Sequence, residues 1–190
     1  MKKAVLIVLI AGMASWAVYD FVSPAADTAD KEEDTGESSS GETAGDESDE
    51  GGLSKGDLAP DFELKTLKGD AVRLSDYQGE RVIVNFWASW CAPCRDEIPD
   101  LQKLYDNKDV EILAVNLTRS EESQEKVRDF VDNYEMSFPK PMDKDGDVAE
   151  KYKVRAYPTS YMINSDGRIQ FKVRGPMPYD VMTEELAKIE

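Results

Sequence analysis

Two cysteines, Cys91 and Cys94, are the residues of this 190-residue chain whose type and spacing best fit a chemical reaction. Only Ala92 and Pro93 separate them. At this spacing one thiol can attack a disulfide and the other can then resolve the mixed disulfide. A thiol must ionise before it attacks, and in C-x-x-C motifs the thiol pKa falls from about 8.5 to roughly 3.5–7.5. The motif therefore predicts a redox-active cysteine pair.

The residues around the pair predict how it is held. An apolar, β-branched run at 82–87 is typical of a buried strand. Beyond Cys94 the apolar residues recur at helical spacing, and Pro93 suits the first turn of a helix. Cys91 should then lie at the exposed start of that helix, where free N–H groups favour a thiolate. These positions make Cys91 the predicted attacking thiol and Cys94 the resolving thiol.

A metal site and a purely structural disulfide are the alternatives. Tetrahedral zinc needs two more ligands, but the chain has no other Cys and no His. A structural disulfide that closes so small a loop would constrain the unfolded chain little. The acidic stretch 143–147 departs from a calcium loop, because Gly146 falls at its fourth position and no Glu stands at its twelfth. We therefore expect no metal or other cofactor, and a solvated turn at 143–147.

Residues 85–99, which read NFWASWCAPCRDEIP, resemble the active-site segment of the TlpA/ResA family of extracytoplasmic thiol–disulfide oxidoreductases, which have the thioredoxin fold. The resemblance covers roughly residues 53–190 and includes the segments 59–62 and 157–159. It implies that Pro158 follows a cis peptide bond opposite the disulfide. It also implies that the backbone of Tyr157 pairs with an extended segment of the substrate.

The same resemblance implies a proton-handling role for Glu97, which lies one helical turn beyond Cys94. Thioredoxins carry a buried Asp in the preceding strand where this chain has Asn85, so general-base duty is expected to move to Glu97. The alternative is that Glu97 only complements the helix dipole. Trp90 is predicted to bind substrate beside Tyr157 and Pro158, whereas Trp87 fits an apolar rim or the core equally well.

A peroxidase is a further alternative, because peroxiredoxins share the entry motif at 59–62. Those enzymes have Thr or Ser three residues before the reactive cysteine and Pro four residues before that. Here the two positions hold Ala88 and Val84. We therefore do not expect peroxidase activity.

Composition predicts three segments: 1–23, 24–56 and 57–190. Lys2 and Lys3 precede an apolar run that extends to Tyr19, which is the pattern of an export signal. Segment 1–23 fits an uncleaved membrane anchor, which we favour, or a cleaved signal peptide. Segment 24–56 is acidic and nearly free of large apolar residues, so it should be a solvated tether.

In segment 57–190, strands alternate with helices. We expect a hairpin within 58–74, strands at 82–87, 110–117, 158–163 and 168–173, and helices after Cys94 and at 120–134, 147–152 and 178–189. This order predicts an α/β, thioredoxin-like sandwich with a central mixed sheet flanked by helices and an N-terminal β-hairpin extension.

The formal net charge of −16 argues against nucleic-acid binding. An uncleaved anchor with Lys2 and Lys3 inside the cell places the rest of the chain outside, so we expect a single-pass membrane protein whose catalytic domain is extracytoplasmic and reduces disulfides in exported proteins. The resemblance implies apocytochrome c maturation, or a related envelope or sporulation pathway, as the context. A membrane thiol–disulfide electron donor is then a necessary partner, because the exterior lacks a thiol pool. The alternative is a non-catalytic binding or chaperone module with an inert disulfide.

Overall fold

The structure, a computed structural model, describes residues 52–189. The predicted anchor at 1–23 and nearly all of the predicted tether lie outside the described residues. Within residues 52–189, no helix has the length and apolar character needed to cross a membrane.

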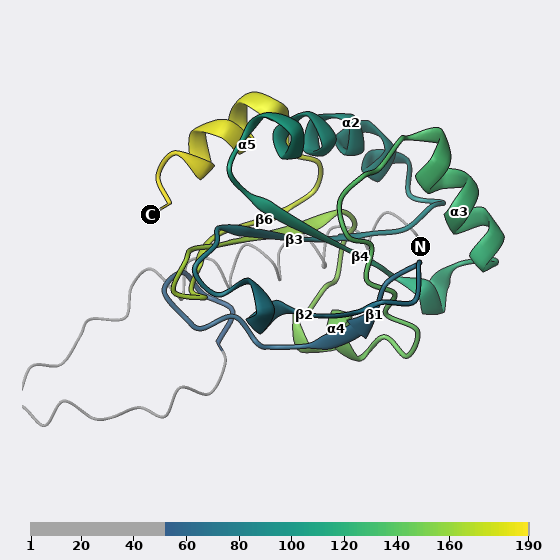
Figure 1. Cartoon of the computed structure of the whole chain (residues 1–190), viewed down its shortest axis with the longest axis horizontal. Coiled ribbons are helices and arrows are strands. Elements are labelled where there is room, and N and C mark those ends of the chain that lie inside the picture. Colours follow the sequence, from purple (N-terminus) through teal and green to yellow (C-terminus); the bar gives the residue numbers. More distant parts are fainter. Residues whose placement is uncertain (1–51, 190) are drawn as a thin grey trace, which may run out of the picture. The chain divides into compact units, whose positions relative to one another are not determined.

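A four-stranded mixed sheet forms the centre of the described domain (Figure 1). Its strands are β3 (Val82–Trp87), β4 (Glu111–Asn116), β5 (Thr159–Ile163) and β6 (Ile169–Arg174), in the spatial order β4-β3-β5-β6. Strand β4 runs parallel to β3. On the other side of β3, strand β5 runs antiparallel to it and forms an antiparallel hairpin with β6. The predicted mixed sheet is confirmed, and each of its strands was expected within one residue at either end.

A separate hairpin precedes the sheet and consists of β1 (Glu63–Lys65) and β2 (Ala71–Arg73). Gly69 lies in its turn with φ at +100°, a conformation that glycine adopts without steric cost. A 3₁₀ turn, η1 (Leu74–Tyr77), connects the hairpin to the sheet. The predicted N-terminal β-hairpin extension is therefore present.

Helices cover both faces of the sheet (Figure 1). On one face lie α2 (Ala92–Asn107), α3 (Gln124–Asn133) and α5 (Tyr179–Leu186), and on the other lie α4 (Asp147–Lys151) and the hairpin. The alternation of side chains along β3 matches this arrangement. Asn85 contacts α2, whereas the ring of Phe86 packs against Tyr152 at the end of α4.

Helix α3 begins later than the sequence pattern indicated. The expected start at residue 120 is wrong, because Thr118–Ser120 forms a 3₁₀ turn, η2. The side chain of Ser123 then accepts a hydrogen bond from the Lys126 N–H and caps the helix.

Trp87 belongs to the core. Its side chain is fully buried, its Nε1 donates to the carbonyl of Ala114 at 3.0 Å, and its ring packs against Phe130. The alternative position on an apolar rim is therefore excluded.

The last residues of the predicted tether lie against the sheet. The Gly56 N–H donates to the carbonyl of Ile169 at 2.7 Å, and Arg168 Nη1 donates to the carbonyl of Gly56 at 2.9 Å. Leu53 is partly buried against the core. Leu53 and Gly56, which the sequence analysis assigned to the tether, thus contact the folded domain.

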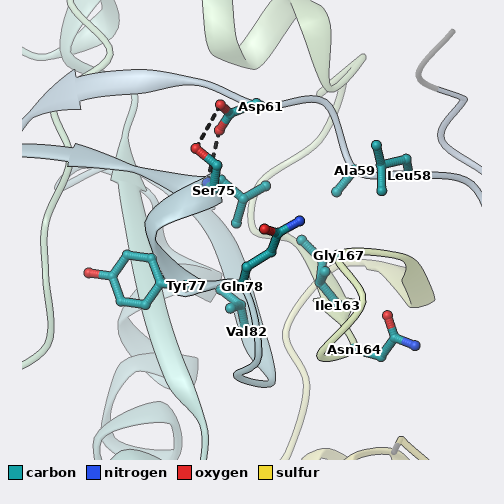
Figure 2. A pocket seen from close by; sticks show the side chains of 11 residues that line it. Leu58, Ala59, Asp61, Ser75, Tyr77, Gln78, Val82, Ile163, Asn164 and Gly167 are labelled. Atoms are coloured by element: carbon teal, nitrogen blue, oxygen red, sulfur yellow. Dashed lines mark hydrogen bonds between the residues drawn. The ribbon is translucent and has the colours of Figure 1, made fainter. Parts of the chain in front are cut away.

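A cavity of about 90 Å³ lies between the hairpin segment and the β5–β6 turn (Figure 2). It is lined by the start of β3 at Val82 and the end of β5 at Ile163, so it lies at the opposite end of β3 from the cysteines. Asp61, the carboxylate in its lining, is engaged by the N–H and the hydroxyl of Ser75. We assign this cavity to the packing of the hairpin on the sheet.

Candidate active site

Cys91 and Cys94 form a disulfide at the start of α2, with their Cα atoms 5.3 Å apart. Cys91 occupies the N-cap of the helix, as the sequence predicted. The Cys94 N–H donates to Cys91 Sγ at 3.3 Å. This N–H belongs to the first helical turn and has no carbonyl partner within the helix, so it is available to the Cys91 sulfur, which also lies at the positive end of the helix dipole. Both features would stabilise a Cys91 thiolate after reduction.

The expectation that Cys91 is exposed is wrong for this disulfide form. Cys91 is 4% exposed and Cys94 is 1% exposed. The reason is the turn before the helix, where the Cys91 N–H donates to the carbonyl of Ala88 at 3.1 Å. This turn draws Cys91 against the fully buried Ala88, and it leaves Ala92 and Pro93 as the outward residues of the motif.

Glu97 is buried one turn below the disulfide, with only 2% of its surface exposed. Its Oε1 accepts the Met177 N–H at 3.1 Å and its Oε2 accepts Asn85 Nδ2 at 2.9 Å. The pKa of Glu97 is raised to about 7, chiefly by burial; the two hydrogen bonds oppose this rise, and the nearby Asp100 adds to it. A group that changes charge near neutral pH is suited to proton transfer, and this burial does not fit a surface residue that only complements the dipole.

Asn85 joins Glu97 to the neighbouring strand. Its Nδ2 also donates to Ser160 Oγ at 2.9 Å, and both Asn85 and Ser160 are fully buried. Among the described residues, Asn85 Oδ1 has no hydrogen-bond partner. Sequence reasoning gave Asn85 no role, although a polar residue inside the apolar run 82–87 was a signal for one.

The peptide bond between Tyr157 and Pro158 is cis, as the resemblance implied. Tyr157 is 36% exposed and Trp90 is 48% exposed, and their rings meet edge to face with centroids 5.7 Å apart. Trp90 Nε1 donates to the carbonyl of Ser120 at 3.0 Å, which orients its ring. The structure therefore brings two of the predicted substrate-binding residues together beside Cys91.

Glu121 is a polar residue of the site that sequence reasoning missed. Its carboxylate accepts the Ser89 N–H at 2.7 Å, the Ser89 hydroxyl, and Asn116 Nδ2 at 2.7 Å. These bonds attach the loop before Cys91 to the end of β4. Ser89 and Glu121 are far apart in sequence, so no local pattern indicates that they meet.

The stretch 143–147 is a helix-capping turn. Asp143 is 1% exposed, and its carboxylate accepts N–H groups from Gly146, Val148 and Ala149 at the start of α4. The expectation of a solvated turn is wrong for Asp143, because those N–H groups would otherwise lack a partner. Within residues 52–189, no group of acidic or cysteine side chains is arranged to hold a metal ion.

A mixed α/β sheet, a C-x-x-C disulfide at a helix start and a nearby cis-proline loop define the class of thioredoxin-fold thiol–disulfide oxidoreductases. Residues 55–172 match the model of the AhpC/TSA family, and the chain belongs to this family. It is 44% identical over 131 residues to the thioredoxin-like protein YneN of Bacillus subtilis, an alignment that covers 67% of this chain and 76% of YneN.

Two further proteins are similar to this chain. The thiol–disulfide oxidoreductase ResA of Oceanobacillus iheyensis is 43% identical over 129 residues, which cover 64% of this chain and 66% of ResA. The crystal structure of StoA from Bacillus subtilis superimposes with a TM-score of 0.60 at 33% identity, and the match covers 67% of this chain and 96% of StoA. The chain is a thiol–disulfide oxidoreductase.

Proposed function

We propose that this enzyme reduces disulfide bonds in exported proteins, with Cys91 as the attacking thiol and Cys94 as the resolving thiol. The observation that carries the proposal is the Cys91–Cys94 disulfide at the start of α2, where the Cys94 N–H already donates to Cys91 Sγ. The free N–H groups and dipole of the helix favour a thiolate at residue 91 rather than at residue 94.

In the reduced enzyme, the Cys91 thiolate attacks one sulfur of the substrate disulfide. The substrate S–S bond breaks, a mixed disulfide forms, and the first substrate thiolate leaves and takes a proton. Cys94 then loses its proton and attacks Cys91 Sγ, which releases the second substrate thiolate and forms the Cys91–Cys94 disulfide. Two electrons pass from the enzyme to the substrate, so a dithiol donor must reduce the enzyme again.

Glu97 is proposed to accept the Cys94 proton. It lies one helical turn from Cys94, and a pKa of about 7 lets it accept and release a proton near neutral pH. Burial keeps water from competing for that proton. Trp90, Tyr157 and Pro158 are proposed to hold an extended substrate segment, because Trp90 directly precedes Cys91 and its exposed ring meets that of Tyr157, which precedes the cis proline.

The sequence of residues 1–56 supports an extracytoplasmic position on a membrane anchor and an acidic tether. We therefore propose that the enzyme serves apocytochrome c maturation or a related envelope or sporulation pathway, and that a membrane thiol–disulfide protein supplies its electrons. The similarity to the sporulation thiol–disulfide oxidoreductase A of Bacillus subtilis supports the sporulation alternative.

Trapping and alkylation test the proposal. A Cys94→Ala variant should accumulate mixed disulfides with exported proteins, whereas Cys91→Ala should trap none. In Cys91→Ser and Cys94→Ser proteins, the remaining thiol should be alkylated faster near neutral pH when it is Cys91. Faster reaction of Cys94 would reverse the two roles.

The sequence also allowed a non-catalytic module with an inert disulfide, and the near-complete burial of both cysteines in the oxidised form is in line with that alternative. It predicts that mild reduction leaves Cys91 slow to alkylate and that Cys94→Ala traps no partner. Rapid alkylation of Cys91 would exclude it.

A further inference from the structure

Three cationic side chains gather at one edge of the sheet. Lys172 Nζ lies 4.7 Å from the centroid of the Tyr161 ring, and Lys172 is half-buried. Partial burial lowers the pKa of Lys172, and the charges of Arg174 and Lys153 lower it further. We call Lys153, Lys172 and Arg174 the basic cluster.

The chain leaves this cluster without counterions in its described part. Within residues 52–189 none of the three side chains forms an ion pair. Like charges at close range repel one another. The chain carries 39 acidic residues, yet no carboxylate of the described residues forms an ion pair with the cluster. An uncompensated cluster of this kind is available to an external anionic group.

The basic cluster borders the substrate-binding residues. Arg174 pairs in register with Thr159, which directly follows the cis proline, and the Gly175 N–H donates to the carbonyl of Pro158 at 2.8 Å. Lys153 lies in the loop between α4 and β5, four residues before Tyr157. Strand β6 is the last strand of the sheet. Residues 56–59 bond to the chain around its start, at 167–169, whereas among the described residues no strand pairs with the outer side of Lys172 and Arg174.

We propose that the basic cluster binds an acidic segment that flanks the disulfide in the protein substrate. This inference rests on the proposed function and adds a substrate preference to it. A polypeptide that passes the Trp90–Tyr157 pair comes next to the end of β6. Opposite charge at that position raises the rate of encounter and fixes the direction in which the segment lies. The attraction acts over roughly 8–10 Å at physiological ionic strength, so it selects only residues close to the exchanged disulfide.

Three disulfide-bonded peptides test the proposal. They share one cystine and differ in having acidic, neutral or basic residues beside it. The full chain is first reduced, and the single-turnover rate of thiol transfer to each peptide is measured at low and at high salt. The reduced parent protein should react with the acidic peptide about three- to tenfold faster than with the basic peptide at low salt, and salt should remove the difference.

The test variant is Lys153→Asn combined with Arg174→Gln. Lys153 has φ at +48°, and Asn adopts this left-handed conformation readily, so the charge is removed without backbone strain. The matched control is Lys68→Gln combined with Lys108→Gln, which removes two exposed charges on the β4 side of the sheet. The test variant should lose most of the preference for the acidic peptide and keep its rate with the neutral peptide. The control should keep both.

The outcomes separate this proposal from the function on which it rests. If the parent reduces all three peptides at one rate, or if the control loses the preference as the test variant does, the basic cluster is not a docking surface and the enzyme remains a disulfide reductase. If the reduced parent reacts with none of the peptides, both the function and the docking surface are overturned. Melting temperatures of the variants show whether each one is folded.

Discussion

Glu97 occupies a position where opposing effects set its charge near neutral pH. Burial favours the neutral acid, whereas the Met177 N–H and the Asn85 amide favour the carboxylate. Reduction of the disulfide produces two thiols near Glu97, and a thiolate there would disfavour ionisation of the Glu97 carboxyl. The three groups should therefore titrate as a coupled set.

Replacement of Glu97 by Gln should slow disulfide exchange and change its pH dependence. Gln keeps the shape of the side chain but can neither accept nor release a proton. The loss should fall within the roughly 10²- to 10⁴-fold range of general acid–base catalysis. Single-turnover rates from pH 5 to 9 measure it. Parent-like rates with a parent-like pH profile would remove Glu97 from the catalytic site.

The same group should make the folded protein less stable as the pH rises from about 4.5 to about 7. In that window the folded state keeps the proton of Glu97 and the unfolded state releases it, so unfolding is favoured by rising pH. Above the folded-state pKa both states are ionised and the loss is complete. The difference between the pKa of Glu97 in the unfolded state, about 4.5, and in the folded state, about 7, corresponds to roughly 3 kcal/mol in the free energy of unfolding.

Urea unfolding of the oxidised parent and of Glu97→Gln at pH 4.5 and pH 8 measures this effect. The parent should lose more stability between the two pH values than the variant, since other titrating groups are common to both. Equal losses would mean that Glu97 has no raised pKa.

Asn85 is expected to act as a positioning residue for the Glu97 proton. Its amide donates to Glu97 Oε2, so Asn85→Ala should raise the pKa of Glu97 above about 7. Ser160→Ala is the matched control, because Ser160 contacts Asn85 but no hydrogen bond joins it to Glu97. The carboxyl band in infrared difference spectra reports the titration. If the role of Asn85 were purely structural, Asn85→Ala would lower the melting temperature and leave the pKa of Glu97 unchanged.

At the scale of elements, polar contacts join the loop before Cys91 to the connection between β4 and α3. Glu121, which follows η2, fixes Ser89, and Ser120 in η2 accepts Trp90 Nε1. Arg95 adds hydrogen bonds from its guanidinium to the Ser89 carbonyl. The loop before Cys91 is thus held by backbone and side-chain bonds from both α2 and the β4–α3 connection.

Glu121→Ala should lower the free energy of unfolding by about 1–3 kcal/mol. The substitution leaves the fully buried Asn116 amide and the Ser89 N–H without their carboxylate partner. Chemical denaturation measures the change. The neighbouring Glu122 is exposed, so Glu122→Ala serves as the control and should be nearly neutral. Equal effects of the two substitutions would contradict this role for Glu121.

Sequence periodicity predicted the elements because each strand and helix carries its own local signal. The run at 82–87 matches β3 residue for residue, and the position of Cys91 at a helix start followed from Pro93 and the apolar spacing beyond it. The burial of Cys91 and the role of Glu121 could not be predicted in this way. Both depend on contacts between residues that are distant in sequence or on a turn whose geometry is not encoded by residue type alone.

Glu97 shows an intermediate case. Its spacing from Cys94 placed it on the correct helix face, whereas its raised pKa depends on Met177 and Asn85, which lie on other elements. Local sequence thus predicted the candidate residue, and only the tertiary structure gives the environment that sets its chemistry.

At the scale of the whole molecule, the charge is unevenly distributed along the sequence. Segment 24–56 contains eleven acidic residues and only Lys31 and Lys55 as basic ones. The described domain holds the basic cluster at its β6 edge. If this segment is the solvated tether that its composition predicts, it would repel acidic substrates at a distance, whereas the proposed docking at the basic cluster would act only at short range.

The folded unit should begin at Leu53 rather than at Asp57, and truncation tests this boundary. Removal of residues 1–51 leaves every hydrogen bond of the described residues in place, so we expect the free energy of unfolding to match that of the full chain. Removal of residues 1–57 also deletes the hydrogen bonds that Gly56 and Asp57 make to Ile169 and that Arg168 makes to Gly56.

The longer deletion removes these three hydrogen bonds and should therefore lower the free energy of unfolding by about 1.5–4.5 kcal/mol, at roughly 0.5–1.5 kcal/mol for each bond. Both proteins should still unfold cooperatively and exchange disulfides in solution, because the core residues and the cysteines remain in both. Urea unfolding and single-turnover exchange measure the two quantities. If removal of residues 1–51 alone abolished cooperative unfolding, residues before Gly52 would have to be part of the folded unit.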